Sequence, residues 1–313
     1  MRIGLVVDSG CDLPRSFIDE HNILVLPISI RIGDELFVDE RDPDRTTEFY
    51  RRQALDKSQD AETVPFSMEQ IRDLFLNKVV TNYDYALVQT IAQSRSPIFQ
   101  NATDASHAIL RAYKPVRKAA GVEGPFALRV IDSQSLFAGQ AALAVETVRL
   151  IESGVKVNEL RQRVEELATK AHGFGTFPDL YYVRERARKK GDNSISWLGA
   201  FMGSALDIKP ILCGRHDQTF PVAKVRHFDA AVARIFDYTV KRIERGLLAP
   251  TVCVSYAGDA EAIKQMPGYD RFVQAARAHD VQVMTSMMAT TGGVNLGPGA
   301  LVVGFLAEPE EFE

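Results

Sequence analysis

Two hydroxyl side chains, Ser96 and Thr63, stand where the chain could hold an anionic ligand. Ser96 follows a strand-like apolar run, residues 85–91, and a polar turn. Pro97 then opens a helical pattern, and because proline is favoured at the first helical position, Ser96 is predicted to be the N-cap. A hydroxyl and free amides at the amino end of a helix can bind a carboxylate or phosphate. A serine that only caps its own helix also fits the pattern, and that alternative stays open.

Thr63 lies in a segment, residues 56–66, that is predicted to be a polar loop. The residues that follow, Ser67 to Gln70, have capping-box spacing, which assigns Ser67 to the start of its own helix. Thr63 is therefore left without a local structural duty. Its hydroxyl could bind a ligand, although a solvated loop threonine is the simpler alternative.

A strand followed by Asp-Ser and then a helix occurs twice, at Asp8-Ser9 and at Asp132-Ser133. In a parallel sheet the carboxyl ends of the strands gather on one edge, where ligands bind at a switch in strand order. Both pairs could instead only cap turns. Ser9 beside Asp8 could also be the nucleophile of a hydrolase, but no histidine is placed by the sequence to activate it.

Patterns that carry metal or nucleotide chemistry are missing. The six histidines show no metal-ligand spacing. The chain has no Walker loop, no dinucleotide-binding glycine motif after a strand and no Gly-x-Ser-x-Gly elbow. The glycine-rich residues 292–299 precede a strand-like run rather than a helix, so they make a weak phosphate cradle. We expect no metal, no cofactor and no catalytic residue.

Composition narrows the class of protein further. A formal net charge of -4 gives no general attraction to nucleic acid, so nucleic-acid binding is not expected. The three cysteines, Cys11, Cys213 and Cys253, lie far apart and are predicted to be reduced. The first apolar run is too short for a signal peptide, and no run approaches the length of a membrane span. We therefore expect a cytoplasmic protein.

Alternating strand and helix patterns predict an α/β fold with two α/β domains, residues 1–153 and 154–313. Residues 177–183 are predicted to be a strand. The basic residues 184–190 are predicted to form a helical face that is solvated or touches an anionic membrane or a partner. The apolar residues 195–206 read as a buried helix, either core or one wall of an apolar tunnel.

Six short segments match a known family in their order and spacing along most of the chain. They are Asp8-Ser9-Gly10-Cys11-Asp12-Leu13-Pro14, Leu24-Val25-Leu26-Pro27-Ile28, Thr63-Val64-Pro65-Phe66-Ser67, Ser94-Arg95-Ser96-Pro97, Ile208-Lys209-Pro210-Ile211-Leu212 and Gly297-Pro298-Gly299-Ala300-Leu301. Each segment alone is a loose match, but together they are specific. On these residues the chain resembles the DegV family of bacterial lipid-binding proteins.

This resemblance implies a long-chain fatty acid, such as palmitate or stearate, bound in a cleft between two α/β domains. Its carboxylate would be held by Thr63 and Ser96, the residues that match the family's threonine and serine. The protein would bind the lipid without catalysing a reaction itself. The alternative that the resemblance implies is a substrate-presenting component of a phosphotransfer system, in which a separate fatty acid kinase converts the bound acid into an acyl phosphate.

The chain departs from the family pattern at two positions. Ser194 stands where the family usually has an arginine, and Asn295 stands where it usually has a histidine. Both family residues are expected near the lipid head group and the surface that meets the kinase. Arg186 or Arg188 could supply the missing positive charge.

Overall fold

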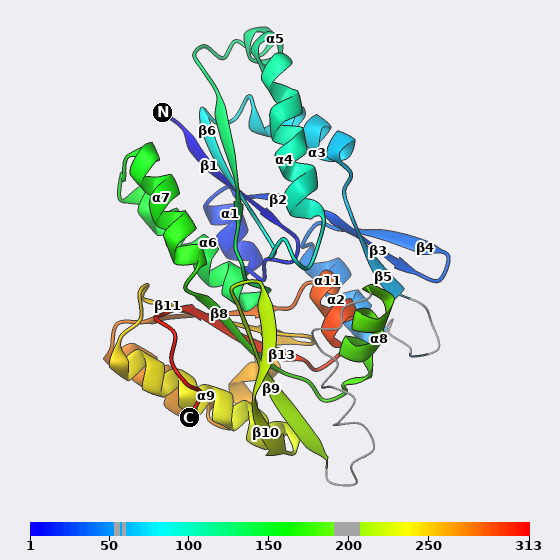
Figure 1. Cartoon of the computed structure of the whole chain (residues 1–313), viewed down its shortest axis with the longest axis vertical. Coiled ribbons are helices and arrows are strands. Elements are labelled where there is room, and N and C mark those ends of the chain that lie inside the picture. The colour runs from blue at the N-terminus through cyan, green and yellow to red at the C-terminus, as the bar shows by residue number, and fades with distance from the viewer. Residues whose placement is uncertain (53–56, 58–60, 191–206) are drawn as a thin grey trace.

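The computed structural model describes residues 1–52, 57, 61–190 and 207–313, which form two lobes (Figure 1). The amino-terminal lobe contains a four-stranded and a three-stranded sheet, and the carboxyl-terminal lobe contains a six-stranded sheet. The α/β class predicted from the sequence is confirmed. Sheets and helices alternate along most of the described chain, as the strand and helix patterns predicted.

The four-stranded sheet is parallel throughout. Its strands lie in the order β2 (Leu24–Leu26), β1 (Ile3–Asp8), β6 (Tyr85–Thr90) and β7 (Ala127–Asp132). Helices cover both faces, so every residue of the central strand β6 is buried. The helices around it are α1 (Arg15–Glu20), α3 (Met68–Leu74), α4 (Ile98–Ala108), α5 (Tyr113–Ala119), α6 (Ala138–Glu152) and α7 (Val157–Ala168).

The three-stranded sheet begins after Pro27, which separates β2 from β3 (Ile28–Ile32). Proline cannot donate a ladder hydrogen bond, and the chain leaves the parallel sheet there. The new sheet is antiparallel, in the order β4 (Glu35–Asp39), β3 (Ile28–Ile32) and β5 (Ala61–Pro65). Helix α2 (Pro43–Arg51) follows β4 and is capped by Asp42, whose side chain accepts from Arg45 N.

The six-stranded sheet is antiparallel except at one edge, where β11 and β12 run parallel. Its order is β10 (Gln218–Arg226), β9 (Ile208–Arg215), β8 (Ala171–Thr176), β13 (Leu301–Leu306), β11 (Thr251–Tyr256) and β12 (Gln282–Met287). Helices α9 (Phe228–Arg245) and α10 (Tyr269–Ala278) cover one face of this sheet. The other α-helices in the described part of this lobe are α8 (Tyr181–Lys190) and α11 (Thr290–Leu296).

Helix α6 lies between the two large sheets and contacts both of them. Its residues are almost all buried, and they share one apolar core with β1, α7 and part of the six-stranded sheet. The division of the chain into residues 1–153 and 154–313 stays a prediction. Because α6 packs mainly on the six-stranded sheet, the core joins the lobes rather than separating at that point.

Two predicted elements are wrong, those at residues 177–183 and 56–66. Residues 177–183 are not a strand: the strand is β8, just before them, and its apolar signal is diluted by two glycines and a histidine. The glycine-rich stretch precedes the last strand, as predicted, and its residues 290–296 form the short helix α11, in which residues 290–294 are all buried. The supposed polar loop at residues 56–66 contains strand β5, whose Thr-Val pair completes the ladder with β3.

Candidate functional site

The turn after β6 is fixed by hydrogen bonds that three of its consecutive backbone amides, those of residues 91–93, donate to neighbouring segments. The first donates to Asp8 Oδ2, the second to Ser135 O at 3.0 Å and the third to Asp132 Oδ1 at 3.1 Å. These acceptors end or follow β1 and β7, the two strands that flank β6 in the sheet. The repeated Asp-Ser pattern therefore meets at one sheet edge, as predicted, and its aspartates fix the turn that leads to Ser96.

The two carboxylates of this clamp are removed from water to different extents: Asp8 is buried and Asp132 is half-buried. Asp8 is fully buried and also accepts from Gly10 N at 2.8 Å, and burial raises the pKa of its carboxyl to about 6. Asp132 also accepts from Gln134 N at 2.9 Å. Its pKa is raised to about 6 as well, first by burial and then by the nearby Asp217 carboxylate. At neutral pH both groups are charged, which makes them strong acceptors for backbone amides.

Ser96 lies at the end of this turn and lines a cavity. Helix α4 begins at Ile98, one residue later than predicted, and Ser96 Oγ accepts from Ile98 N at 3.3 Å. The prediction that Ser96 is the N-cap is wrong, because Pro97 occupies that position; the contact with Ile98 N uses only an acceptor site of the Ser96 hydroxyl. Because a serine hydroxyl also carries one donor, its proton can still be given to a ligand in the cavity.

Thr63 lines the same cavity from strand β5. It lies opposite Ile30 in the antiparallel ladder, so its backbone position is set by β3 rather than by a loop. Among the described residues no partner hydrogen-bonds its side chain. The structure therefore brings the two predicted hydroxyls to one hollow, Thr63 from strand β5 and Ser96 from the turn between β6 and α4.

The cavity lies between the two lobes and offers about 150 Å³ to the centres of water-sized molecules. Most of its wall is apolar, and the described residues that form it come from both lobes. They are Ile28, Thr63, Ile91, Arg95, Ser96, Leu136, Phe137, Gly173, Gly175, Phe177, Val183, Arg186, Ala187, Leu212, Gly214, Thr219, Thr291, Asn295, Leu296 and Val302.

Glycines leave room along one side of this cavity. Gly173 and Gly175 alternate on β8 and so face the same side of the sheet, and Gly214 pairs with Gly173 from β9. A Cβ added at Gly214 would meet Leu136 at 3.7 Å, an ordinary contact. The absence of side chains at these three glycines leaves space for a ligand. At Gly214 the backbone does not require glycine, because an added Cβ would make only ordinary contacts.

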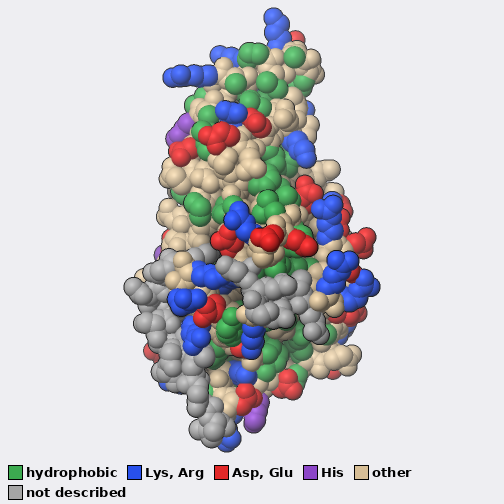
Figure 2. Space-filling model, turned by 90° about the vertical axis from the view of Figure 1, so that its right-hand side faces the viewer, with side chains coloured by type: hydrophobic (Ala, Val, Ile, Leu, Met, Phe, Trp, Pro, Cys, Tyr) green, Lys and Arg blue, Asp and Glu red, His purple; other side chains and the backbone are tan. Residues whose placement is uncertain are grey.

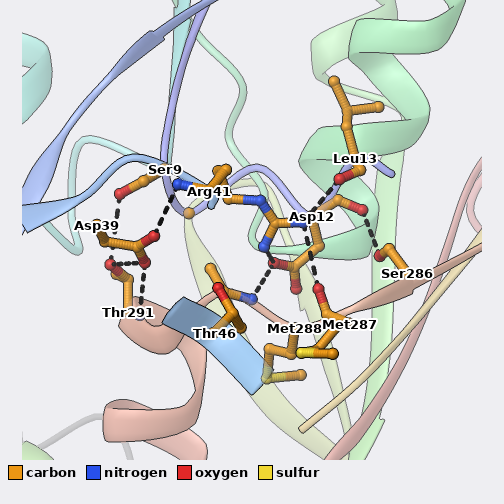
Figure 3. Close-up of polar contacts among 12 residues, drawn as sticks. Ser9, Asp12, Leu13, Asp39, Arg41, Thr46, Ser286, Met287, Met288 and Thr291 are labelled. Atoms are coloured by element: carbon orange, nitrogen blue, oxygen red, sulfur yellow. Dashed lines mark hydrogen bonds and ion pairs between the residues drawn. The ribbon is translucent and has the colours of Figure 1, made fainter. Parts of the chain in front are cut away.

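A buried polar network fastens the first turn of α11 to the amino-terminal lobe (Figure 3). Thr291 donates from its backbone N and its Oγ1 to Asp39 Oδ2, both at 3.0 Å. Asp39 Oδ1 accepts from Arg41 N at 3.1 Å. Ser9 Oγ lies 3.4 Å from Thr291 Oγ1 and accepts from Ile28 N at 3.1 Å. Because Ser9 is fully buried in these contacts, the geometry argues against its use as a nucleophile.

An ion pair completes the network on its other side. Arg41 Nη1 donates to Asp12 Oδ1 at 3.0 Å, and its Nη2 reaches Leu13 O at 2.7 Å and Met287 O at 3.2 Å. Asp12 Oδ1 also accepts from Ala289 N at 2.8 Å. Burial raises the pKa of Asp12 to about 6, while the Arg41 charge acts in the opposite direction. The strand-end loop after β1 is thereby joined to the residues between β12 and α11.

The basic segment at residues 184–190 lies on helix α8, which directs two of its arginines to different sides. Arg188 is exposed and pairs with Glu185 at 2.8 Å, whereas Arg186 is half-buried and lines the cavity. Residues two apart on a helix point to nearly opposite sides. Of the two arginines predicted as substitutes, Arg186 is the one that reaches the cavity. On the face shown in Figure 2, basic and acidic side chains are intermingled rather than grouped by sign.

Of the two positions that depart from the family pattern, only Asn295 belongs to the described residues. Asn295 lines the cavity, and its Nδ2 donates to Thr291 O at 2.7 Å. Ser194 and the apolar helix predicted over residues 195–206 lie outside the described residues. No sequence pattern indicated a role for Thr291, because its partners Asp39 and Ser9 are distant in the chain.

Two further observations concern metals and membranes. Within the described ranges, no three His, Cys, Asp or Glu side chains gather as ligands for a metal ion. None of the helices described there is both long and apolar enough to cross a bilayer. The three cysteines are buried free thiols, as the sequence predicted.

Comparisons with known proteins agree with this architecture. The family model described as an uncharacterised protein of the DegV family matches residues 2–308. A DegV domain-containing protein of Xanthomonas axonopodis pv. citri is 50% identical over 312 residues, covering 100% of this chain and 99% of that protein. A DegV domain-containing protein of Xanthomonas campestris pv. campestris is also 50% identical, with the same coverage.

Solved structures share the fold at lower sequence identity. A DegV lipid binding protein from Thermotoga maritima has a TM-score of 0.76 at 20% identity, covering 99% of this chain and 100% of that chain. DegV from Bacillus subtilis, described as a fatty acid binding protein, has a TM-score of 0.75 at 21% identity, with 98% and 100% coverage. A stearic acid-binding protein from Eubacterium ventriosum has a TM-score of 0.76 at 21% identity, with 97% and 98% coverage.

The clamp on the turn before Ser96 can be tested with Asp8→Asn. An amide can accept only on its oxygen, so one of the two backbone amides that Asp8 binds loses its partner. We expect the free energy of unfolding, measured by urea titration at neutral pH, to fall by about 1–3 kcal/mol. Asp19→Asn, which removes an exposed acid paired with Arg15, should cost less than about 0.5 kcal/mol. Equal stability of the Asp8 variant and the wild type would show that the clamp is not needed.

Proposed function

The chain belongs to the DegV family, and from that premise we propose that it binds a long-chain fatty acid in the cavity between its lobes. The carboxylate would be held by Thr63 and Ser96. The observation that carries the proposal is that these two hydroxyls, separated in the sequence, line one mostly apolar hollow. Solved relatives described as fatty acid binding, including one described with stearic acid, support the same ligand class.

The energetics suit this division of labour. Burying about 15 methylenes at about 0.8 kcal/mol each gives roughly 12 kcal/mol before the costs of binding are subtracted. A hydrogen bond to a carboxylate contributes about 1.5–3 kcal/mol. The acyl tail would therefore supply most of the affinity, and the hydroxyls would set the orientation of the acid.

Thr63→Ala and Ser96→Ala should each weaken palmitate binding by about tenfold to a hundredfold without abolishing it, because each removes one hydrogen bond to the carboxylate. Isothermal titration calorimetry measures the change. Thr103→Ala is the matched control, since its hydroxyl is bound to Phe99 O within α4 and does not line the cavity. Unchanged affinity in both site variants would remove these residues from the carboxylate site.

The glycine-lined side of the cavity offers a test of where the acyl tail lies. Gly214→Val places three carbons in the hollow, and each displaced methylene costs about 0.8 kcal/mol, so palmitate affinity should fall about tenfold to a hundredfold. Decanoate, with a shorter tail, should lose much less. Calorimetry with both acids measures the difference, and equal losses for the two would place the tail elsewhere.

A substrate-presenting role beside a fatty acid kinase remains the second candidate. Its support is the family membership, and Asn295 weighs against it, because this residue lines the cavity where the family usually has a titratable histidine. We expect a purified fatty acid kinase, given ATP and palmitate, to form acyl phosphate no faster when this protein is added. Faster formation, measured as hydroxamate, would favour the presenting role.

The remaining parts of the proposal concern catalysis, location and membrane contact. We propose that the protein acts by binding, without catalysis of its own, since Ser9 is buried and bonded. A cytoplasmic location and transient contact with an anionic membrane surface are proposed on sequence grounds. The pairing of Arg188 with Glu185 reduces the charge that α8 could offer to such a surface.

A further inference from the structure

Arg186 is a cation placed against an apolar hollow. It extends from α8, is half-buried and lines the cavity together with Thr63 and Ser96. Its Nε donates to Val294 O on α11 at 3.1 Å. That contact fixes the direction of the guanidinium group and leaves the two Nη atoms, with four N–H donors, for other partners.

The two carboxylates whose charges act on Arg186, those of Glu62 and Glu185, pair with other arginines. Glu62, the residue before Thr63, interacts most strongly with Arg186 among the nearby charges, but its carboxylate pairs with Arg31 at 3.3 Å. Glu185 pairs with Arg188 at 2.8 Å. Within the described part of the chain, no carboxylate lies within ion-pair distance of Arg186. Burial correspondingly lowers the pKa of its guanidinium below the usual value.

The wall of the cavity adds no negative charge. Its described residues include two arginines and no aspartate or glutamate. The second arginine, Arg95, belongs to the turn before Ser96 and donates from Nη2 to Thr219 Oγ1 at 3.1 Å. Burying a cation without an anionic partner is costly, whereas an anion with correct geometry offsets much of that cost. The hollow is therefore prepared for a ligand with a negatively charged end.

We propose that Arg186 supplies the counter-charge for the ligand carboxylate and makes the site select acids over neutral lipids. This inference rests on the proposed function and adds a residue to it. Arg186 lines the same cavity as Thr63 on β5 and Ser96 before α4. A planar guanidinium can bind both oxygens of a carboxylate, while Thr63 and Ser96 donate single hydrogen bonds.

A comparison of palmitate with palmitamide tests this role, because the amide has nearly the same shape and carries no charge. The wild type should bind palmitate at least about tenfold more tightly than palmitamide. In Arg186→Met this ratio should fall to within about threefold, mainly through weaker palmitate binding. Arg186→Lys, which keeps the charge but not the fork, should give an intermediate ratio. Arg188→Met, the matched control on the exposed side of α8, should leave the ratio unchanged.

The ratio of the two affinities separates this role from a structural one. Loosening α8 from α11 would weaken the binding of palmitate and of palmitamide to the same extent. If Arg186→Met lowers thermal stability, Arg186→Gln carries the same comparison, because its amide can still donate to Val294 O. A full preference for palmitate in a folded Met or Gln variant would overturn the inference. A wild type that binds both lipids equally would also overturn it while leaving the proposed function intact. A wild type that binds neither would overturn the proposed function itself.

Discussion

The site depends first on the capture of three neighbouring backbone amides by acceptors from the two strands beside β6. The amides of residues 91–93 would have no partners at the end of a buried strand, and leaving them unpaired would be costly. Asp8, Ser135 and Asp132 satisfy them. Because these acceptors come from the ends of two different strands, they fix the position of the turn. The turn in turn fixes the position of Ser96.

Burial strengthens this arrangement and also sets its chemical limits. A carboxylate in a shielded environment is a strong acceptor, but the same burial raises the pKa of Asp8 and of Asp132 to about 6. The clamp therefore works with charged carboxylates at neutral pH. The repeated Asp-Ser pattern thus has a positioning role: its aspartates do not line the cavity but fix the residues that do.

A second set of buried polar contacts determines how the lobes meet. Thr291 reaches Asp39 and Ser9, and Arg41 reaches Asp12 and the backbone of Met287 (Figure 3). Such directional contacts fix the relative position of two surfaces more narrowly than apolar packing does. The wall of the cavity can therefore stay mostly apolar, with its glycine-lined side open. The charges and hydroxyls that hold the two lobes together lie mainly behind this wall.

The sequence by itself determined the strand, Asp-Ser and helix rhythm, the capping of α3 by Ser67, the family, and the choice of Thr63 and Ser96 as candidate site residues. These features are local, or are fixed in order along the chain. Tertiary structure decided the rest. Residues 61–65 became a strand because β3 offered a free edge, and residues 290–296 became a helix because both lobes bury it. Arg186 and Arg188 look alike in the sequence, but the helical repeat sends them to opposite sides, and only the packing of α8 on α11 decided which one faces the cavity.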